Sequence, residues 1–329
     1  MKLRVLSKAD VQRAITMREA VEVTKDAFVQ LSTGEAVVPL RSALQVPERD
    51  GVTLFMPAFL SGSGGLGAKI ASVFPHNAEL GLPMIHAVVV MVDPATGQPL
   101  ALLDGTYLTA LRTGAVSGAA TDLLARSDAR TAAVFGAGVQ GRTQLEAVCA
   151  VRQIEAAWVY DPNAEAAMHY AEQLQGQPGM PMRITVAETP AAAVEAADVI
   201  CTATTSSLPV FDSGLVRPGT HINAVGAFTP QMKEVDVVGL RASRIVVDSR
   251  SACLAEAGDL IIPLNEGLIP GVDDWTELGE IAAGRAKGRI TDEEVTYFKS
   301  VGNAVQDVSV GRAILLAAQQ MGLGVEVDL

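Results

Sequence analysis

Aromatic side chains, cysteine and clustered positive charge are all scarce in this chain of 329 residues. Aromatic residues make up only 4% of it, and just three cysteines occur, at Cys149, Cys201 and Cys253. An odd number of widely separated cysteines in apolar or helical surroundings does not predict a disulfide framework or a metal motif, so we expect small core residues. The four histidines are scattered and form no HExxH motif, so the sequence predicts no metal site.

The charge balance argues against a further class of protein. The formal net charge is −12 and no dense run of lysine and arginine occurs, so the positive surface that binds nucleic acid is lacking. No stretch approaches the ~20 apolar residues that a membrane-spanning helix needs, and the first residues, MKLRVLSKAD, lack the apolar core of a signal peptide. We therefore expect a soluble cytoplasmic protein that binds neither nucleic acid nor membrane.

Alanine, valine, leucine and glycine are abundant, and 49% of the residues are hydrophobic, which favours packed helices and buried strands of an α/β protein. The sequence predicts a strand at Leu3–Leu6 and then a helix that begins near Ser7 or Asp10. Apolar residues at helical spacing continue to Leu31, and Gly34 is expected to end this helix.

From residue 37 to about residue 103 the pattern changes to short β-rich runs separated by proline, glycine and asparagine, which predicts an antiparallel sheet with loops. The expected strands are Thr53–Met56, Gly67–Val73, Ile85–Val92 and Leu100–Leu103. The segment Thr106–Leu124 is rich in alanine, leucine and threonine, and it predicts a helix that leads into a second domain.

From Arg130 onwards strands and helices alternate, which is typical of a parallel sheet. The expected strands are Ala132–Phe135, Ala157–Tyr160, Ile184–Ala187, Asp198–Thr202, His221–Val225 and Ile245–Asp248, with helices starting at Val139 and spanning Ala164–Leu174. About six strands fit a doubly wound Rossmann sheet. After Trp275 we expect helix, and the last helix, Asn303–Met321, should pack back on the first domain. Residues 119–302 would then form a Rossmann domain inserted into an α+β domain of residues 1–118 and 303–329.

The most informative local motif is Gly136-Ala137-Gly138-Val139-Gln140-Gly141, which joins the first strand of the parallel sheet to a helix. In such a loop Gly136 permits a tight turn, Gly138 lets backbone N–H groups approach a pyrophosphate, and Gly141 allows close helix–strand packing. Asp161 follows Gly141 by 20 residues, where a carboxylate accepts ribose hydroxyls and repels a 2′-phosphate. The alternative is a glycine-rich turn that binds nothing. Because strand, glycines, helix and acidic residue are in register, we predict bound NAD(H) in preference to NADP(H).

Several further segments look familiar in this order: Gly67-Ala68-Lys69-Ile70-Ala71-Ser72-Val73-Phe74-Pro75, Gly81-Leu82-Pro83, Asp104-Gly105, Leu108-Thr109-Ala110-Leu111-Arg112-Thr113-Gly114, His221-Ile222-Asn223-Ala224-Val225-Gly226 and Gly302-Asn303-Ala304-Val305-Gln306-Asp307. Together they resemble the ornithine cyclodeaminase/μ-crystallin family over nearly the whole chain. The resemblance implies a homodimer, in which the α+β domain binds substrate and dimerises while the Rossmann domain binds NAD(H). Family members interconvert an amine with an imine next to a carboxylate, by hydride transfer to or from nicotinamide.

The resemblance also implies roles for single residues. Arg41 and Arg112 match the family's carboxylate-binding basic residues, and Arg112 would also lie near the cofactor. Lys69 matches the active-site lysine, whose ammonium would protonate the imine nitrogen, and we take it as the catalytic residue. By the same resemblance Val139 and Gln140 contact the pyrophosphate, Asp161 the ribose, Thr202 and Val225 the flanks of the cofactor, and Ser300 and Val301 the nicotinamide and substrate region. Taken without the resemblance, Arg41 and Lys69 would be surface charges, and His221 would be structural.

Phe228 departs from the family pattern. Cyclodeaminases and archaeal alanine dehydrogenases carry an aspartate at this place, two residues after the glycine of Asn-Ala-Val-Gly. A phenyl ring cannot move the protons that the oxidative deamination of ornithine requires. Two further departures are Met232, where cyclodeaminases have a lysine, and Met84, where threonine is common.

These departures favour the reductase branch of the family. We expect an NADH-dependent reductase of α-imino acids, cyclic ones such as Δ1-pyrroline-2-carboxylate first, with Phe228 packed against an apolar part of the substrate. An ordinary core aromatic is the alternative for Phe228. Ornithine cyclodeaminase or alanine dehydrogenase activity remains the alternative within the family. A non-catalytic, μ-crystallin-like nucleotide-binding protein is the alternative from another class.

Overall fold

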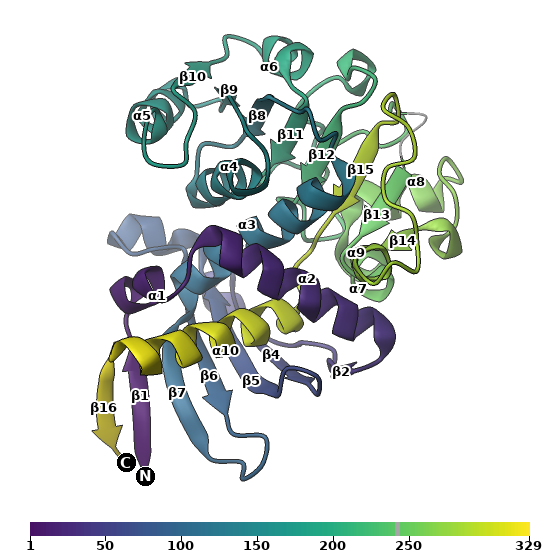
Figure 1. The fold of residues 1–329 in the computed structure, drawn as a ribbon. Coiled ribbons are helices and arrows are strands. Elements are labelled where there is room, and N and C mark those ends of the chain that lie inside the picture. Colours follow the sequence, from purple (N-terminus) through teal and green to yellow (C-terminus); the bar gives the residue numbers. More distant parts are fainter. Residues whose placement is uncertain (241–243) are drawn as a thin grey trace. The chain divides into compact units, whose positions relative to one another are not determined.

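The structure, a computed structural model, describes residues 1–240 and 244–329. The chain forms two compact units, residues 1–112 with 304–329 and residues 113–303 (Figure 1). The sequence predicts the boundaries at 118/119 and 302/303, and the functional roles of the two domains stay predictions. Among the described residues, no helix has the length and hydrophobicity that crossing a bilayer would require.

The first unit is an eight-stranded sheet with helices on one face. Its strands are β1 (Lys2–Leu6), β2 (Ala36–Val37), β3 (Ser42–Val46), β4 (Gly51–Leu60), β5 (Gly65–Val73), β6 (Ile85–Val92), β7 (Pro99–Asp104) and β16 (Val325–Asp328). The order is β16-β1-β7-β6-β5-β4-β2, β3 also pairs with β4, and every pairing except β1–β7 is antiparallel. The predicted antiparallel sheet is therefore confirmed, and β2, β3 and β16 are additions to it.

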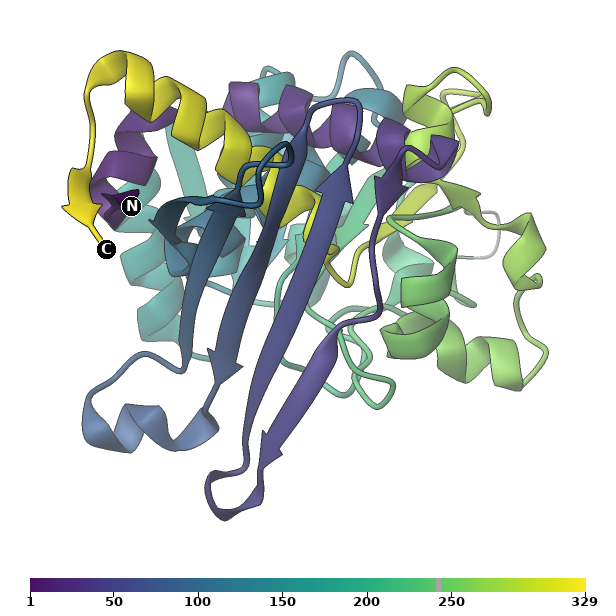
Figure 2. The same ribbon diagram turned by 90° about the horizontal axis from the view of Figure 1, so that it is seen from below.

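Three helices cover one face of this sheet: α1 (Lys8–Ala14), α2 (Met17–Thr33) and α10 (Ala304–Met321). Two short 3-10 helices, η1 (Pro47–Arg49) and η2 (Pro75–Leu80), lie in loops between the strands. Seen from below, the long strands lie in front of the helices (Figure 2). The last helix packs on β4, β5 and β6, as predicted. Residues from both ends of the chain therefore contribute to the core of this unit.

The prediction of one continuous helix up to Gly34 is wrong, because the segment contains two. Ile15 is extended, with φ −149° and ψ 138°, and so interrupts the helical hydrogen bonds. The Thr16 side chain then accepts from the N–H of Glu19, whose side chain accepts from the N–H of Thr16, and this capping box begins α2. Ser7 caps α1, and Gly34 ends α2 with φ 81°, both as predicted.

The second unit is a doubly wound parallel sheet, which confirms the Rossmann fold. Its strands are β8 (Thr131–Phe135), β9 (Ala156–Tyr160), β10 (Arg183–Val186), β11 (Val199–Thr202), β12 (His221–Ala224), β13 (Arg244–Val247), β14 (Thr276–Glu277) and β15 (Thr296–Lys299). They follow the order β10-β9-β8-β11-β12-β15-β13-β14, with every pair parallel. The succession β10-β9-β8-β11-β12 is the 3-2-1-4-5 arrangement of nucleotide-binding sheets.

Helices and hydrophobic cores lie on both faces of this sheet (Figure 1). The helices and 3-10 helices are α3 (Gly105–Leu124, which begins in the first unit), α4 (Val139–Val151), α5 (Ala164–Leu174), α6 (Pro190–Ala196), η3 (Ser213–Leu215), α7 (Arg250–Glu256), α8 (Gly258–Asn265), η4 (Val272–Asp274) and α9 (Leu278–Ala282). On β8, Ala133 and Phe135 belong to one core, and Ala132 and Val134 to the other. Burial on both faces explains why these strands are continuously apolar in sequence.

The expectation of helix after Trp275 is wrong in part. Two strands, β14 and β15, follow Trp275, and the sheet therefore has eight strands where about six are predicted. Only α9 is helical before residue 296, and β15 then enters the sheet between β12 and β13. All four residues of β15 are buried. They include Lys299, whose Nζ donates to Asp259 Oδ2 at 2.6 Å. A buried lysine at the end of a four-residue strand hides the apolar run that would otherwise identify it.

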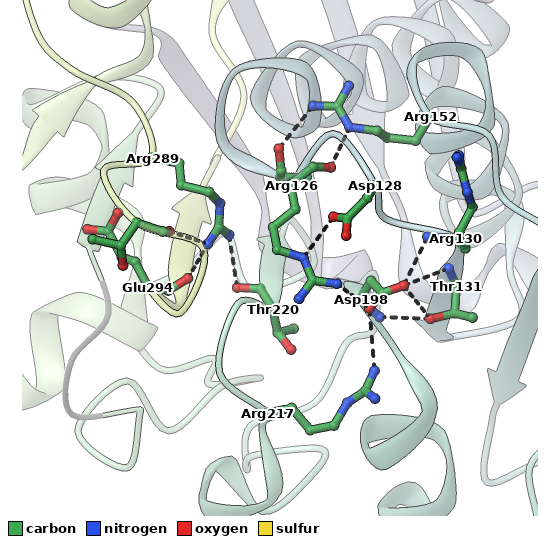
Figure 3. Close-up of polar contacts among 12 residues, drawn as sticks. Arg126, Asp128, Arg130, Thr131, Arg152, Asp198, Arg217, Thr220, Arg289 and Glu294 are labelled. Atoms are coloured by element: carbon green, nitrogen blue, oxygen red, sulfur yellow. Dashed lines mark hydrogen bonds and ion pairs between the residues drawn. The ribbon is translucent and has the colours of Figure 1, made fainter.

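The amino ends of the parallel strands are held by a network of polar contacts (Figure 3). Asp198, directly before β11, accepts hydrogen bonds from the N–H of Arg130 and from the N–H and hydroxyl of Thr131, at 2.8–3.1 Å. The guanidinium groups of Arg126 and Arg217 lie 3.1 and 3.5 Å from its other oxygen. Burial opposes ionisation of Asp198, but these contacts prevail and lower its pKa.

Two further arginines, both drawn in Figure 3, bind carbonyl oxygens in or directly after the last turn of α3. Arg152 donates to the carbonyl oxygens of Thr121, Asp122, Ala125 and Arg126. Arg289 donates to the carbonyl oxygen of Leu124 at 2.7 Å. Carbonyl oxygens at the end of a helix lack some of the partners that the helix interior provides, and the arginines supply donors to them. This edge of the sheet is therefore structural, and the opposite, carboxyl edge is where ligands bind in such folds.

Candidate active site

The glycine loop after β8 crosses the carboxyl edge of the parallel sheet. Gly136 has φ 100°, and a Cβ there would lie 2.6 Å from the carbonyl oxygen of Ala203. A Cβ on Gly141 would lie 2.0 Å from the carbonyl oxygen of Gly136. A Cβ on Gly138 would meet nothing within 4 Å. Packing within the protein therefore accounts for glycine at 136 and 141 but not at 138, where the space in front of α4 stays open.

This open space is what a pyrophosphate needs to approach the backbone N–H groups at a helix N-terminus. Gly138 is the N-cap of α4 and makes no side-chain cap, and Val139, the first residue of the helix, is 67% exposed. The residues of the loop therefore fit a dinucleotide, and the open space at Gly138 supports this independently of the sequence motif.

A cavity of about 630 Å³ adjoins the loop, a volume suited to a small ligand or to part of a dinucleotide. Its lining includes Gly136, Gly138, Asp161, Thr204 and Ser206. The two carboxylate oxygens of Asp161 accept hydrogen bonds from the N–H groups of Ala137 and Asn163, each at 2.9 Å. The second strand and the loop thus fix a single negative charge at the cavity wall.

Thr202 lies at the end of β11, fully buried, and its hydroxyl donates to Glu234 at 3.1 Å. Glu234 also accepts from the N–H groups of Thr204, Gly226 and Ala227 at 2.6–2.9 Å. This buried carboxylate therefore ties together the loops that follow β11 and β12. Burial raises the pKa of Glu234, although Lys299 opposes the rise. Sequence reasoning missed Glu234, because no motif marks it.

Asp248 plays the same part for the residues after β15. Its Oδ2 accepts from the Ser300 hydroxyl at 2.7 Å and from the N–H groups of Val301 and Gly302 at 3.0 Å. The hydroxyl of Ser300 therefore takes part in holding the loop that follows β15. Ser300, Val301 and Val225 are all buried, so their predicted contacts with a cofactor stay predictions.

Phe228 follows β12, and 42% of it is exposed. The alternative that it is an ordinary core aromatic is therefore wrong. An exposed phenyl ring on a loop after a strand of a Rossmann sheet stands where ligand-contacting residues of this fold occur. Its predicted role against an apolar part of the substrate stays a prediction.

His221 and the cysteines lie in surroundings that suit structural residues. His221 is fully buried, with its ring nitrogens 2.9 Å from Thr296 Oγ1 and 3.1 Å from Asn223 Oδ1. Burial lowers the pKa of His221 to about 3, so the ring is neutral. Burial also raises the pKa of Cys201 to about 12, which removes the thiolate that nucleophilic chemistry requires.

Lys69 lies in β5 of the first unit, and its side chain is only 2% exposed. Its cross-strand neighbours are Met56 on β4 and Val89 on β6, both apolar. The ammonium Nζ donates to Asp307 Oδ1, in the first turn of α10, at 2.9 Å. Arg112 Nε lies 3.0 Å from the same oxygen. One carboxylate oxygen is thus shared by two buried cations.

Arg112 is held at a second point, since its Nη1 donates to Gln306 Oε1 at 2.9 Å. Asp307 and Gln306 belong to a segment that marks the family resemblance, but the sequence assigns neither a role. The positive charge of Arg41 also acts on Lys69. The structure therefore brings together the three predicted basic residues of the first unit.

The pKa of Lys69 falls from 10.5 to about 8. Burial is the largest cause, and the charges of Arg112 and Arg41 add to it, while Asp307 opposes them. An ammonium with a pKa near 8 is protonated at neutral pH and yet gives up its proton far more readily than an ordinary lysine. With two arginines beside it, this cluster can bind a carboxylate and deliver a proton.

Comparison with known proteins places the chain in a family. The model of the ornithine cyclodeaminase/mu-crystallin family matches residues 1–320. A Δ1-pyrroline-2-carboxylate reductase of Bacillus cereus is 38% identical over 325 residues, which cover 98% of this chain and 99% of the relative.

Two solved structures are similar over the whole fold. The Thermococcus litoralis Δ1-pyrroline-2-carboxylate reductase, in complex with NADH and L-proline, has a TM-score of 0.94 and 43% identity, covering 99% of this chain and 100% of that one. An archaeal alanine dehydrogenase dimer with bound NAD has a TM-score of 0.91 and 35% identity, covering all of both chains. The chain therefore belongs to the ornithine cyclodeaminase/mu-crystallin family.

Proposed function

We propose that this protein is an NADH-dependent reductase of α-imino acids that acts first on cyclic imines such as Δ1-pyrroline-2-carboxylate. The observation that carries the proposal is the buried ammonium of Lys69, which lies in one cluster with two arginines and has its pKa lowered to about 8. The similarity to reductases of this substrate, one of them in complex with NADH and L-proline, supports it.

The residues of the first unit account for substrate binding. Arg41 and Arg112 bind the carboxylate, and the fixed guanidinium of Arg112 orients it. Lys69 donates its proton to the imine nitrogen, because an iminium accepts hydride far better than a neutral imine. NADH, when bound, supplies the hydride to the C=N carbon. Imine reduction does not require the cluster to remove a proton from an amine. This suits a chain that has phenylalanine, and not a carboxylate residue, at position 228.

The second unit holds the cofactor. The N–H groups at the start of α4, with Val139 and Gln140, bind the pyrophosphate over the open space at Gly138. Asp161 accepts the ribose hydroxyls at the cavity wall. Its negative charge repels a 2′-phosphate, and we therefore infer a preference for NADH over NADPH.

The open face of the first sheet supports a homodimer. Side chains that alternate with the buried ones on β4, β5 and β6 point to this face, and they are apolar and half-buried or exposed: Phe55, Pro57, Phe59, Leu66, Ile70, Val88 and Val90. Contiguous apolar surface of this kind marks a protein interface. Light scattering should show a dimer, and Val90→Glu should yield monomers. A monomeric wild-type protein would refute this part of the proposal.

The direct test of the reductase proposal is NADH oxidation with Δ1-pyrroline-2-carboxylate, compared with its six-membered homologue and with pyruvate plus ammonia. We expect the highest kcat/KM with a cyclic imine and L-proline as the product of the five-membered ring. Tight NADH binding without oxidation would indicate a non-catalytic binding protein. Release of ammonia from ornithine with NAD⁺ would indicate a cyclodeaminase instead.

A further inference from the structure

Asp307 forms the centre of the basic cluster in the first unit. It is fully buried, and its Oδ1 lies 2.9 Å from Lys69 Nζ and 3.0 Å from Arg112 Nε. Its Oδ2 is buried and has no hydrogen-bond partner among the described residues. Leaving a buried charged oxygen without a partner costs free energy. Packing alone therefore does not explain why a carboxylate stands here.

A second buried lysine–aspartate pair in the chain shows what a structural pair looks like. Asp259 Oδ2 accepts from Lys299 Nζ at 2.6 Å, and its Oδ1 accepts from the N–H groups of Glu234 and Val235. Both oxygens are satisfied, and both side chains are fully buried. Asp307 differs in that one oxygen binds two cations and the other binds nothing described.

We propose that Asp307 is a positioning residue for imine reduction: it aims Lys69, keeps that lysine protonated, and fixes Arg112 relative to it. The inference rests on the proposed function, in which Lys69 is the acid. Lys69 is the proton donor, and Arg112 binds the carboxylate of the substrate. Because both side chains contact Asp307 Oδ1, this one atom fixes their positions relative to each other.

The groups around Lys69 support this role. The neighbouring strands present Met56 and Val89, which carry no charge, and the one histidine of β6, His86, is paired with Ser72. Arg112 on α3 and Arg41 before β3 both disfavour the ammonium, as burial does, and Asp307 on α10 opposes them. Without the Asp307 charge, the pKa of Lys69 would fall below about 8, and the lysine would lose its proton in the range where the enzyme must donate one.

The test compares wild type, Asp307→Asn and Asp307→Glu, with Asp259→Asn as the matched change in the second buried lysine–aspartate pair. Two quantities are measured on the full chain. The first is kcat/KM for Δ1-pyrroline-2-carboxylate from pH 5.5 to 9.5. The second is the titration of the Lys69 Cε signal by NMR of protein with ¹³C-labelled lysine, assigned with Lys69→Met.

We expect a wild-type alkaline limb and a Lys69 titration near pH 8. Both should move down by about one pH unit or more in Asp307→Asn, and both should stay near 8 in Asp307→Glu, which retains the charge. Asp259→Asn should unfold at a lower temperature without moving either midpoint.

Unchanged midpoints in Asp307→Asn would overturn the inference, and so would a wild-type Lys69 that titrates well below pH 7, because the lysine would then be neutral in spite of Asp307, even if no variant folds. A third outcome is that the Lys69 titration shifts in Asp307→Asn while the alkaline limb of kcat/KM does not. Asp307 would then still act on the charge of Lys69, but Lys69 would not be the acid, and the mechanism in the proposed function would be overturned.

Discussion

Replacing Lys69 with methionine should strongly slow imine reduction and at the same time stabilise the folded protein. Methionine has nearly the length of lysine and no charge, so it can fill the same space between Met56 and Val89. Asp307 does not become an unpaired buried charge in the variant, because Arg112 Nε remains 3.0 Å from its Oδ1. Loss of a general acid lowers rates by roughly 10²–10⁴-fold.

The expected gain in stability follows from the pKa of Lys69. Its fall from 10.5 to about 8 means that folding disfavours the ammonium by roughly 3 kcal/mol. Because the folded pKa lies below the unfolded one, the unfolded chain binds more protons between pH 8 and 10.5, and wild-type stability rises with pH through that window. Methionine avoids this cost, so the variant should be more stable at pH 7 by up to roughly 3 kcal/mol, and its advantage should shrink as the pH rises towards 10.5.

The assay is the unfolding midpoint of cofactor-free wild type and Lys69→Met in urea at pH 7 and pH 9.5, alongside NADH oxidation. Lys299→Met is the matched control, since it removes the other buried lysine but leaves Asp259 without its ion-pair partner at 2.6 Å. We expect that control to be less stable than wild type. A Lys69→Met protein that is less stable than wild type at pH 7, or an advantage that does not depend on pH, would refute the reasoning.

Other changes have equally definite outcomes. Gly138→Ala should leave the unfolding temperature unchanged and weaken NADH binding measured by fluorescence, whereas Gly141→Ala should destabilise the fold, since its Cβ would lie 2.0 Å from a carbonyl oxygen. Equal NADH affinity of Gly138→Ala and wild type would argue against the pyrophosphate site. Asp161→Ser should bring the kcat/KM values for NADH and NADPH closer together; an unchanged ratio would place discrimination elsewhere. Asp198→Asn should lower stability at pH 7 by about 1–3 kcal/mol. Because the pKa of Asp198 is lowered in the fold, that difference should vanish as the pH falls below 3.8, and a difference persisting at low pH would contradict this.

Local signals predicted much of the fold. Gly34 ends α2 through its positive φ, and the glycine loop joins β8 to α4, because both depend on neighbouring residues. The break at Thr16 was also readable, since Thr16 and Glu19 have the spacing of a capping box. The strand β15 was missed because its place between β12 and β13 is decided by tertiary pairing and its lysine is neutralised by Asp259.

The candidate site shows the same division. Arg41, Lys69 and Arg112 came from a family resemblance, and no periodicity or spacing would have found them. Asp307 is 238 residues away from Lys69 in sequence, so only the folded chain shows that they share a hydrogen bond. Glu234 likewise acts on backbone N–H groups of other loops, a role that side-chain chemistry alone does not reveal.

The central claim is that hydride reaches the C=N carbon of a cyclic imine next to a carboxylate. It is tested most directly by incubating the protein with Δ1-pyrroline-2-carboxylate and NADH that carries deuterium at the transferable position, and locating the label by mass spectrometry and NMR. We predict L-proline with one deuterium at the α-carbon, in equal amount to the NADH oxidised. Unlabelled proline, or NADH that is bound and never oxidised, would contradict the account.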